Sequence, residues 1–187
     1  LYAVPWPAQG LYSKKAINSV ADLKGLKFRA YNSATIRIAE LTGMAPTKIE
    51  AAEISQAFST GAVESMITSP TTGKNSKIWE NGVGYFYDIA AWFPKNMIIV
   101  NKDAWNKLDA ETQKLVMNEA TLAERKGWDL SKKGNVADKK ALSDAGMEVG
   151  KVNSALQKHF QKVGAKMADE WKAKAGARGV SVLAAYK

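Results

Sequence analysis

Arg29 is the residue of this sequence best placed to bind a small anion. It ends the segment 22–29, and alternating apolar residues predict a short strand over residues 26–30. Ser33 then offers an N-cap for a helix that we expect to end at Thr42. A guanidinium at a strand end, beside a helix N-terminus, can hold a carboxylate through two parallel hydrogen bonds. Spacing alone favours an ordinary surface arginine instead, because exposed arginines are common.

Two more groups of side chains would meet Arg29 and Asn32 at one cleft if strands and helices alternate along the chain. Thr68 and Ser69 end a predicted strand that a proline stops. Their hydroxyls could contact a ligand, and simple capping of the strand end is an alternative of equal weight for both residues.

The third group is aromatic. Trp92 and Phe93 lie in the connection between strands expected at 85–91 and 96–101. A ring in this connection would form a wall of the cleft and favour a ligand with an apolar or aromatic body. The alternative is that Trp92 only packs against a neighbouring part of the fold.

The elements that must position these groups alternate between strand and helix. After a short edge strand at 1–6 and a turn that begins at Gln9, we expect strands at 26–30, 46–50 and 65–69 and helices at 33–42 and 53–60. Such alternation predicts an α/β sheet whose strand ends form a cleft.

Long helices dominate the second half of the chain. Asp109 caps a helical tract to about residue 145, in which Gly127 and Gly134 indicate a bend. A brief extended piece at 147–152 precedes a helix over residues 153–175, whose apolar stripe we assign to the core.

Composition excludes several classes of function. The 187 residues contain no cysteine and one histidine, His159, so disulfides, thiolate metal sites and histidine-based catalysis have little support. The net charge of +9 lies mostly in residues 102–187, where seventeen basic residues are scattered among eleven acids. That pattern is typical of solvated helix faces, and no nucleic-acid-binding motif accompanies it. We find no paired acids, nucleophile motif or phosphate-binding glycine loop, so an enzyme is not expected.

Three segments, in this order and spacing, carry a family resemblance: DLKGLKFRAYNSAT, IEAAEISQAFSTGAVESMITS and YFYDIAAWFPKNMIIVNKDAWNKL. From about Leu11 to the C-terminus the chain resembles the extracytoplasmic substrate-binding subunit of TRAP (tripartite ATP-independent periplasmic) transporters. In that family a D-L-K-G turn leads into a strand with a carboxylate-binding arginine, and Arg29 stands at that position. Thr68 stands where many members carry a ligand-contacting asparagine, and Ser65 departs from a usual glycine. A threonine hydroxyl forms fewer hydrogen bonds than an amide, which weakens the expectation for Thr68.

The resemblance implies an α/β fold of the periplasmic-binding-protein-like (type II) two-lobe architecture, mostly the second lobe plus long C-terminal helices. Residues 1–101 would form the α/β ligand-binding lobe with the inter-lobe strands, and residues 102–187 a helical region that packs across the lobes. The chain would then be the C-terminal part of a two-lobed protein.

The implied function is capture of a small organic monocarboxylate or dicarboxylate in the periplasm and its delivery to the TRAP membrane permease subunits. No cofactor, metal, catalytic residue or nucleic-acid partner is expected. The apolar surface exposed where the other lobe is absent predicts a homodimer, strand exchange or weak stability of the chain. The alternative is a ligand-sensing regulatory domain of the same fold, which would need a DNA-binding helix-turn-helix that we do not find in the sequence.

Overall fold

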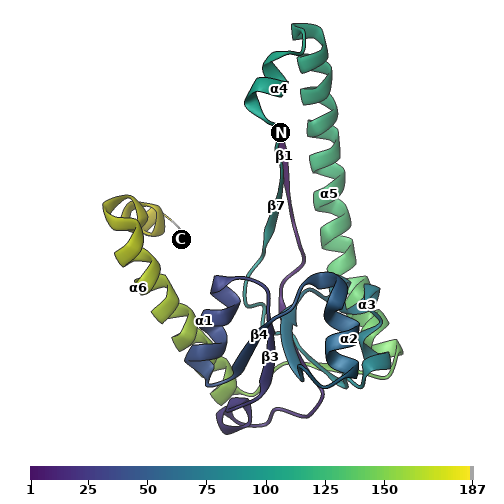
Figure 1. Ribbon diagram of the computed structural model, residues 1–187, viewed down its shortest axis with the longest axis vertical. Coiled ribbons are helices and arrows are strands. Elements are labelled where there is room, and N and C mark those ends of the chain that lie inside the picture. The colour runs from purple at the N-terminus through teal and green to yellow at the C-terminus, as the bar shows by residue number, and fades with distance from the viewer. Residues whose placement is uncertain (186–187) are drawn as a thin grey trace.

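The computed structural model describes residues 1–185 and contains a six-stranded sheet, a separate two-stranded ribbon and helices on both faces of the sheet (Figure 1). The strands are β1 (Tyr2–Pro5), β2 (Gly10–Ser13), β3 (Lys27–Ala30), β4 (Ala45–Lys48), β5 (Ser65–Thr68), β6 (Tyr85–Tyr87), β7 (Lys95–Ile98) and β8 (Glu148–Gly150). The α-helices are α1 (Ser33–Thr42), α2 (Ile54–Ser59), α3 (Pro70–Asn75), α4 (Lys102–Asn106), α5 (Ala110–Asp144) and α6 (Ser154–Ala185), and the 3-10 turns are η1 (Val20–Leu23), η2 (Ala51–Glu53) and η3 (Ile78–Asn81). The expected α/β class is confirmed.

The sheet is mixed, with strand order β4-β3-β5-β2-β6-β8. β3 runs parallel to β4 and β5, whereas β2 runs antiparallel to β5 and β6. The prediction of a turn that begins at Gln9 was wrong, because β2 starts at the next residue, Gly10. A Cβ on Gly10 would lie 2.2 Å from the Phe86 ring, so this strand needs a glycine where it packs against the neighbouring strand.

The core has two parts, one on each face of the sheet. On one face α1 and α6 cover the apolar residues Leu11, Phe28, Ile38, Ile67, Leu156 and Val163. On the other face α2, η3 and the end of α5 cover Tyr12, Ile54, Phe58, Met66, Ile78, Phe86 and Leu142. Alternation along each strand therefore sends neighbouring side chains to opposite halves of the core.

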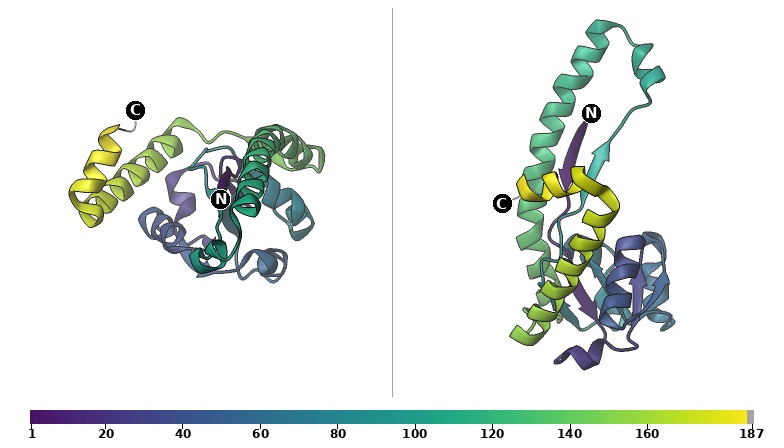
Figure 2. Two further views of the ribbon diagram at one scale, coloured as in Figure 1. Left: turned by 90° about the horizontal axis from the view of Figure 1, so that it is seen from above. Right: turned by 90° about the vertical axis from the view of Figure 1, so that its left-hand side faces the viewer.

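The ribbon of β1 and β7 extends away from the sheet beside the first half of α5 (Figures 1 and 2). Glu124 Oε1 accepts the backbone N–H of Ala3 at 3.0 Å, and Trp128 Nε1 donates to the carbonyl of Ala3 at 3.0 Å. Gly127 lies against Val4, since a Cβ there would lie 2.5 Å from the Val4 side chain. The ribbon is thus fixed to one face of α5.

Two chain segments connect the ribbon to the sheet: residues 6–9 between β1 and β2, which form the N-terminal connection, and residues 88–94 between β6 and β7, which we call the crossing segment. It is tied to the N-terminal connection by backbone hydrogen bonds from Trp6 N to Pro94 O (2.8 Å), from Gln9 N to Trp92 O (3.0 Å) and from Ala91 N to Gln9 O (2.9 Å). The predicted strand over 85–91 ends early, at Tyr87, because Ala90 adopts a positive φ of 45° that a strand cannot accommodate.

The long helices differ from expectation in detail. α5 is one helix through Gly127 and Gly134, so the sequence signal for a bend there did not end the helix. α6 consists of two helical segments joined by a kink at Gly176, whose φ of 63° and ψ of −154° are non-helical, so the first segment ends near residue 175 as expected and a second segment follows it. Arg37 of α1 holds α6 through a two-pronged pair, in which Nη2 and Nε donate to the Glu170 carboxylate at 2.7 and 3.0 Å.

Candidate functional site

Arg29 is a buried cation that no acid of the described chain neutralises. It is 4% exposed, and no carboxylate within residues 1–185 lies within 4.0 Å of its nitrogen atoms. Its Nε donates to the carbonyl of Ile49 at 2.9 Å, and its guanidinium carbon lies 4.8 Å from the centre of the Tyr31 ring. Burial lowers the pKa of Arg29, while Tyr31 and Glu50 act in the opposite direction. Since an arginine stays protonated in proteins, the terminal nitrogens remain charged donors.

Asn32 has a structural role at the start of α1. Its Oδ1 accepts the backbone N–H of Thr35 at 2.9 Å, so Asn32 is the N-cap and the prediction of Ser33 as the cap was wrong by one residue. The Thr35 hydroxyl in turn accepts the N–H groups of Tyr31 and Asn32 at 3.0 and 3.1 Å. These bonds fix the backbone directly after β3, and hence the placement of Tyr31 beside Arg29.

Thr68 and Ser69 reach the same edge of the sheet as Tyr31. The β3–β5 register pairs Arg29 with Met66, which places Tyr31 and Thr68 at corresponding positions two residues further on. Ser69 is the N-cap of α3: its Oγ accepts the N–H of Thr72 at 3.0 Å. Thr68 is buried, and within the described chain its hydroxyl forms no hydrogen bond. Within residues 1–185 the hydroxyl of Thr68 therefore has no hydrogen-bond partner, while that of Ser69 is used by the fold.

A cavity of about 950 Å³ lies between α1, α6 and the crossing segment. Asn32 and Trp92 line it, together with apolar side chains that include Ile38, Ile67, Val163 and Met167. Arg29, Thr68, Ser69 and Phe93 do not line it, and Phe93 is 66% exposed. Of the six predicted site residues, Asn32 and Trp92 therefore line this cavity, and the other four lie outside its lining.

Tyr31 joins the cavity to Arg29. Its ring contacts the guanidinium and also lines the cavity. Burial raises the pKa of Tyr31, while the Trp92 side chain and the Arg29 charge oppose the rise. A ligand with its carboxylate at Arg29 and its body against Tyr31 and Trp92 would contact a charged donor and an apolar wall at once.

Gln9 is a buried polar residue that the sequence analysis missed. It is 3% exposed, and its Nε2 donates to the carbonyl of Pro7 at 2.9 Å. Its backbone N–H and carbonyl hold Trp92 and Ala91, so it sets the position of the crossing segment. Its place before a buried strand was the available signal, but a turn was expected there.

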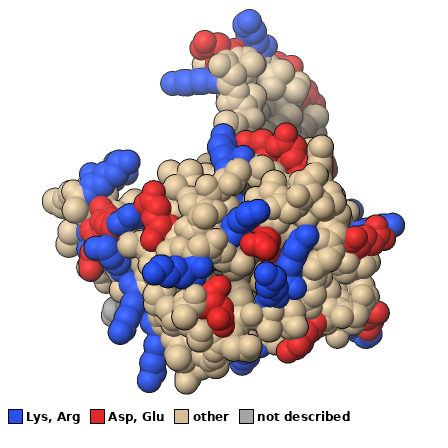
Figure 3. Space-filling model, turned by 60° about the horizontal axis from the view of Figure 1, so that its bottom comes forward, with Lys and Arg blue, Asp and Glu red and all other residues tan. Residues whose placement is uncertain are grey.

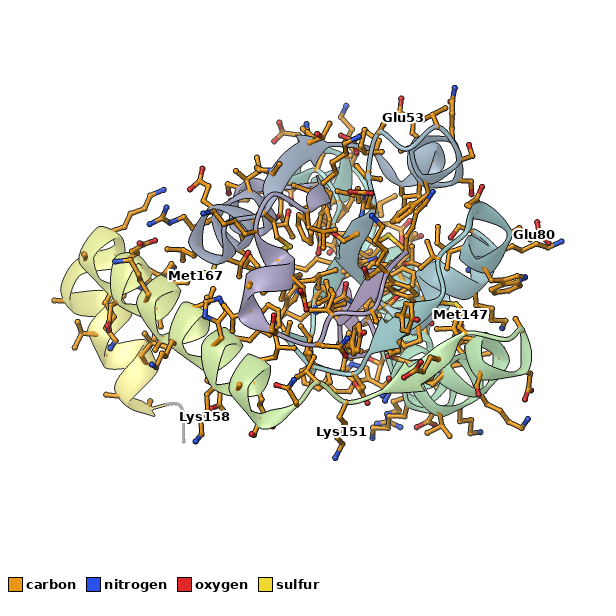
Figure 4. All side chains as sticks on the ribbon, turned by 90° about the horizontal axis from the view of Figure 1, so that it is seen from below. Glu53, Glu80, Met147, Lys151, Lys158 and Met167 are labelled. Atoms are coloured by element: carbon orange, nitrogen blue, oxygen red, sulfur yellow. The ribbon has the colours of Figure 1, made fainter. Side chains whose placement is uncertain are left out.

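Surface charge does not mark the site. Figure 3 shows basic and acidic side chains intermingled over the lower face of the molecule. Lys151 is among the cavity-lining residues, yet its side chain and that of Lys158 point away from the fold (Figure 4). In the part of the chain described, no group of three or more His, Asp or Glu side chains could hold a metal ion. None of the helices up to residue 185 is both long and apolar enough to cross a membrane.

Comparison with known proteins places these features in context. The model of the family described as bacterial extracellular solute-binding protein, family 7, matches residues 8–174. Among curated proteins, the sialic acid-binding periplasmic protein SiaP of Vibrio cholerae is 30% identical over 111 residues, which cover 58% of this chain and 33% of the relative. A solute-binding protein of Albidiferax ferrireducens is 25% identical over 170 residues, 89% of this chain and 50% of the relative.

Solved structures share the fold closely. DctP6, a Bordetella pertussis extracytoplasmic solute receptor that binds pyroglutamic acid, has a TM-score of 0.96 and 41% identity over all of this chain and 62% of its own. A marine metagenome TRAP solute-binding protein specific for pyroglutamate has a TM-score of 0.95 and 38% identity, covering 99% of this chain and 60% of its own. The chain therefore spans half or less of the curated relatives and about three fifths of the matched structures.

Proposed function

Because the chain belongs to the bacterial extracellular solute-binding protein family 7, we propose that it captures a small organic carboxylate in the periplasm and delivers it to the permease subunits of a TRAP transporter. The relatives are substrate-binding proteins of transport systems, which supports this function over a regulatory sensor domain. The proposal requires no bond chemistry, cofactor or metal.

The observation that carries the proposal is the burial of Arg29 without an acidic partner within residues 1–185. An isolated buried charge is strongly unfavourable, because it has left water without gaining an opposite charge. Nε is already held by Ile49, so the guanidinium has a fixed orientation, and within residues 1–185 its terminal nitrogens have no hydrogen-bond partner. A bound carboxylate would supply both the missing charge and two acceptors.

We infer that the ligand is pyroglutamate or a monocarboxylate of similar size and shape. Two structures with 38% and 41% identity bind this compound, and a third, DctP7 of Bordetella pertussis, is 41% identical and also binds it. Arg29 is the one buried arginine or lysine in the described chain, which suits a single carboxylate. The apolar surfaces of Trp92 and Tyr31 suit a compact ring rather than a hydroxyl-rich sugar acid.

We retain the two-part division of the chain as part of the proposal. Residues 1–101 would supply the ligand-binding lobe and the strands that cross between lobes, and residues 102–187 the helices that pack across both. A homodimer is supported by exposed apolar side chains such as Met97 and Ile99.

Mass spectrometry of ligand released from the purified full-length protein, followed by calorimetric titration, tests the function. We expect pyroglutamate to bind, and glucuronate to bind far more weakly or not at all. Binding of sugar acids in preference to pyroglutamate would refute the ligand class, and no binding of any carboxylate would refute the function.

A further inference from the structure

Two consecutive charged residues of α5 contact the two backbone segments that border the candidate site. Asp138 is 4% exposed, although it is a carboxylate within the last two turns of a long helix. It accepts a hydrogen bond from the Thr71 hydroxyl at 2.6 Å and one from Lys74 Nζ at 2.8 Å. Thr71 belongs to the first turn of α3, directly after Thr68 and Ser69.

The start of α3 is held from its other side by Tyr12. The Tyr12 hydroxyl donates to the carbonyl of Ser69 at 3.0 Å, and a Cβ on Gly73 would lie only 2.2 Å from that hydroxyl oxygen. Burial raises the pKa of Tyr12, and the charge of Asp138 adds to the rise. The turn that carries Thr68 is therefore clamped between a tyrosine of the sheet and a carboxylate of α5.

Lys139 contacts the crossing segment, which is the second of the two backbone segments that border the site. Its ammonium pairs with the carboxylate of Asp88, the first residue of the crossing segment, and both side chains are largely buried. The backbone N–H of Asp88 donates to Gly150 O at 2.7 Å, which anchors the same residue to the sheet edge. Trp92 lies four residues further along this segment.

The same helix also holds the ribbon. Glu124 and Trp128 bind Ala3 on β1, as described above, and Gly127 packs against Val4. These contacts lie about 15–21 Å along the helix from Asp138, at about 1.5 Å per residue. One continuous helix thus contacts the ribbon and both borders of the site. Figure 2 shows that this helix runs from beside the ribbon to the sheet.

We propose that Asp138 and Lys139 are positioning residues for ligand binding: they hold the Thr68 turn and the crossing segment in place from α5, so ligand affinity depends on where α5 lies. The inference rests on the proposed function and extends it to residues that do not contact the ligand.

Calorimetric titration with pyroglutamate of the full-length protein and four variants tests this. We expect Asp138→Asn and Lys139→Met each to weaken affinity about tenfold, the effect of losing roughly one charge-assisted hydrogen bond. Lys139→Arg keeps a cation within reach of Asp88 and should restore affinity. Asp144→Asn, which breaks the exposed Lys140–Asp144 pair on the same helix, is the matched control and should bind as wild type does.

Hydrogen exchange without ligand separates this inference from the proposed function. Asp138→Asn should speed exchange of the Thr72 amide, and Lys139→Met that of the crossing segment, whether or not a carboxylate binds. If the wild type binds no carboxylate, the function fails, and the exchange rates alone decide the positioning role. Wild-type affinity and wild-type exchange in both variants would overturn the inference.

Discussion

Replacement of Arg29 by methionine gives the sharpest test of the site, because it should change stability and binding in opposite directions. Without ligand, Arg29 is a buried cation whose one hydrogen bond to protein in the described chain goes to Ile49. Replacing a buried ion pair with apolar side chains is often neutral or stabilising by about 1–4 kcal/mol, and we take the same range for this unpaired buried cation. The lost hydrogen bond costs about 1 kcal/mol. We therefore expect a small net gain in stability.

The expected gain is measurable by thermal melting. A net gain of about 1 kcal/mol raises the melting temperature by roughly 2–4 °C in a protein of this size. Binding should fall steeply, since removal of one partner of a buried charged pair costs about 3–5 kcal/mol. That range corresponds to a loss of affinity of about a hundredfold to a few thousandfold. Pyroglutamate should raise the melting temperature of the wild type and leave that of Arg29→Met unchanged.

Two further variants complete the experiment. Arg29→Lys keeps the charge but loses the planar fork and the Ile49 bond, so it should also bind poorly. Arg125→Met removes an exposed arginine of α5 that forms no ion pair within residues 1–185, and it should bind as the wild type does. Calorimetric affinity of Arg29→Met equal to that of the wild type would refute the assignment of Arg29 as the carboxylate-binding residue.

Three other predictions concern single positions. Trp92→Phe should lower pyroglutamate affinity only modestly and remove most of the ligand-dependent tryptophan emission change; a full change in the variant would show that Trp92 only packs. Gly73→Ala should destabilise by about 1–3 kcal/mol in denaturant melts, because its Cβ would meet the Tyr12 hydroxyl at 2.2 Å, and unchanged stability would contradict that packing. Hydrogen bonds from Thr112 lower the pKa of Asp109, so its contribution to stability is complete above the ordinary aspartate pKa and is lost as pH falls through the lowered value. Asp109→Asn keeps the cap and should reduce the loss of stability that melts of the wild type show as pH falls below the ordinary aspartate pKa. An identical acid dependence of stability in the variant would contradict this.

Local signals in the sequence predicted the helices well. The helix expected at 33–42 is α1, and Asp109 caps α5 as its position indicated. Both predictions rest on contacts between residues three or four apart, which the sequence lists directly. β2 was missed because the Gln9-Gly10 pair is typical of a turn, although the strand lies between β5 and β6 within the sheet.

The candidate site also contains features that local sequence signals predicted and features that depend on tertiary contacts. The position of Arg29 at a strand end follows from local alternation, and its role follows from a family resemblance carried by ordered segments. Its burial without a carboxylate partner could not be predicted, because it depends on Ile49 and Tyr31 closing around it. Phe93 was grouped with the site from its place in an aromatic segment, yet its side chain is largely exposed.

The amino-acid sequence by itself determined the helices, the strand that carries Arg29 and the membership of a solute-binding family. The helices and the strand follow from patterns among neighbouring residues, and the family follows from the order of three segments. Only the tertiary structure decided which side chains meet across the chain. Asp138 binds Thr71 across 67 positions and Lys139 binds Asp88 across 51. Such pairs form because α5 packs along the sheet, and no periodicity within a single helix specifies which distant loop its charged residues will reach.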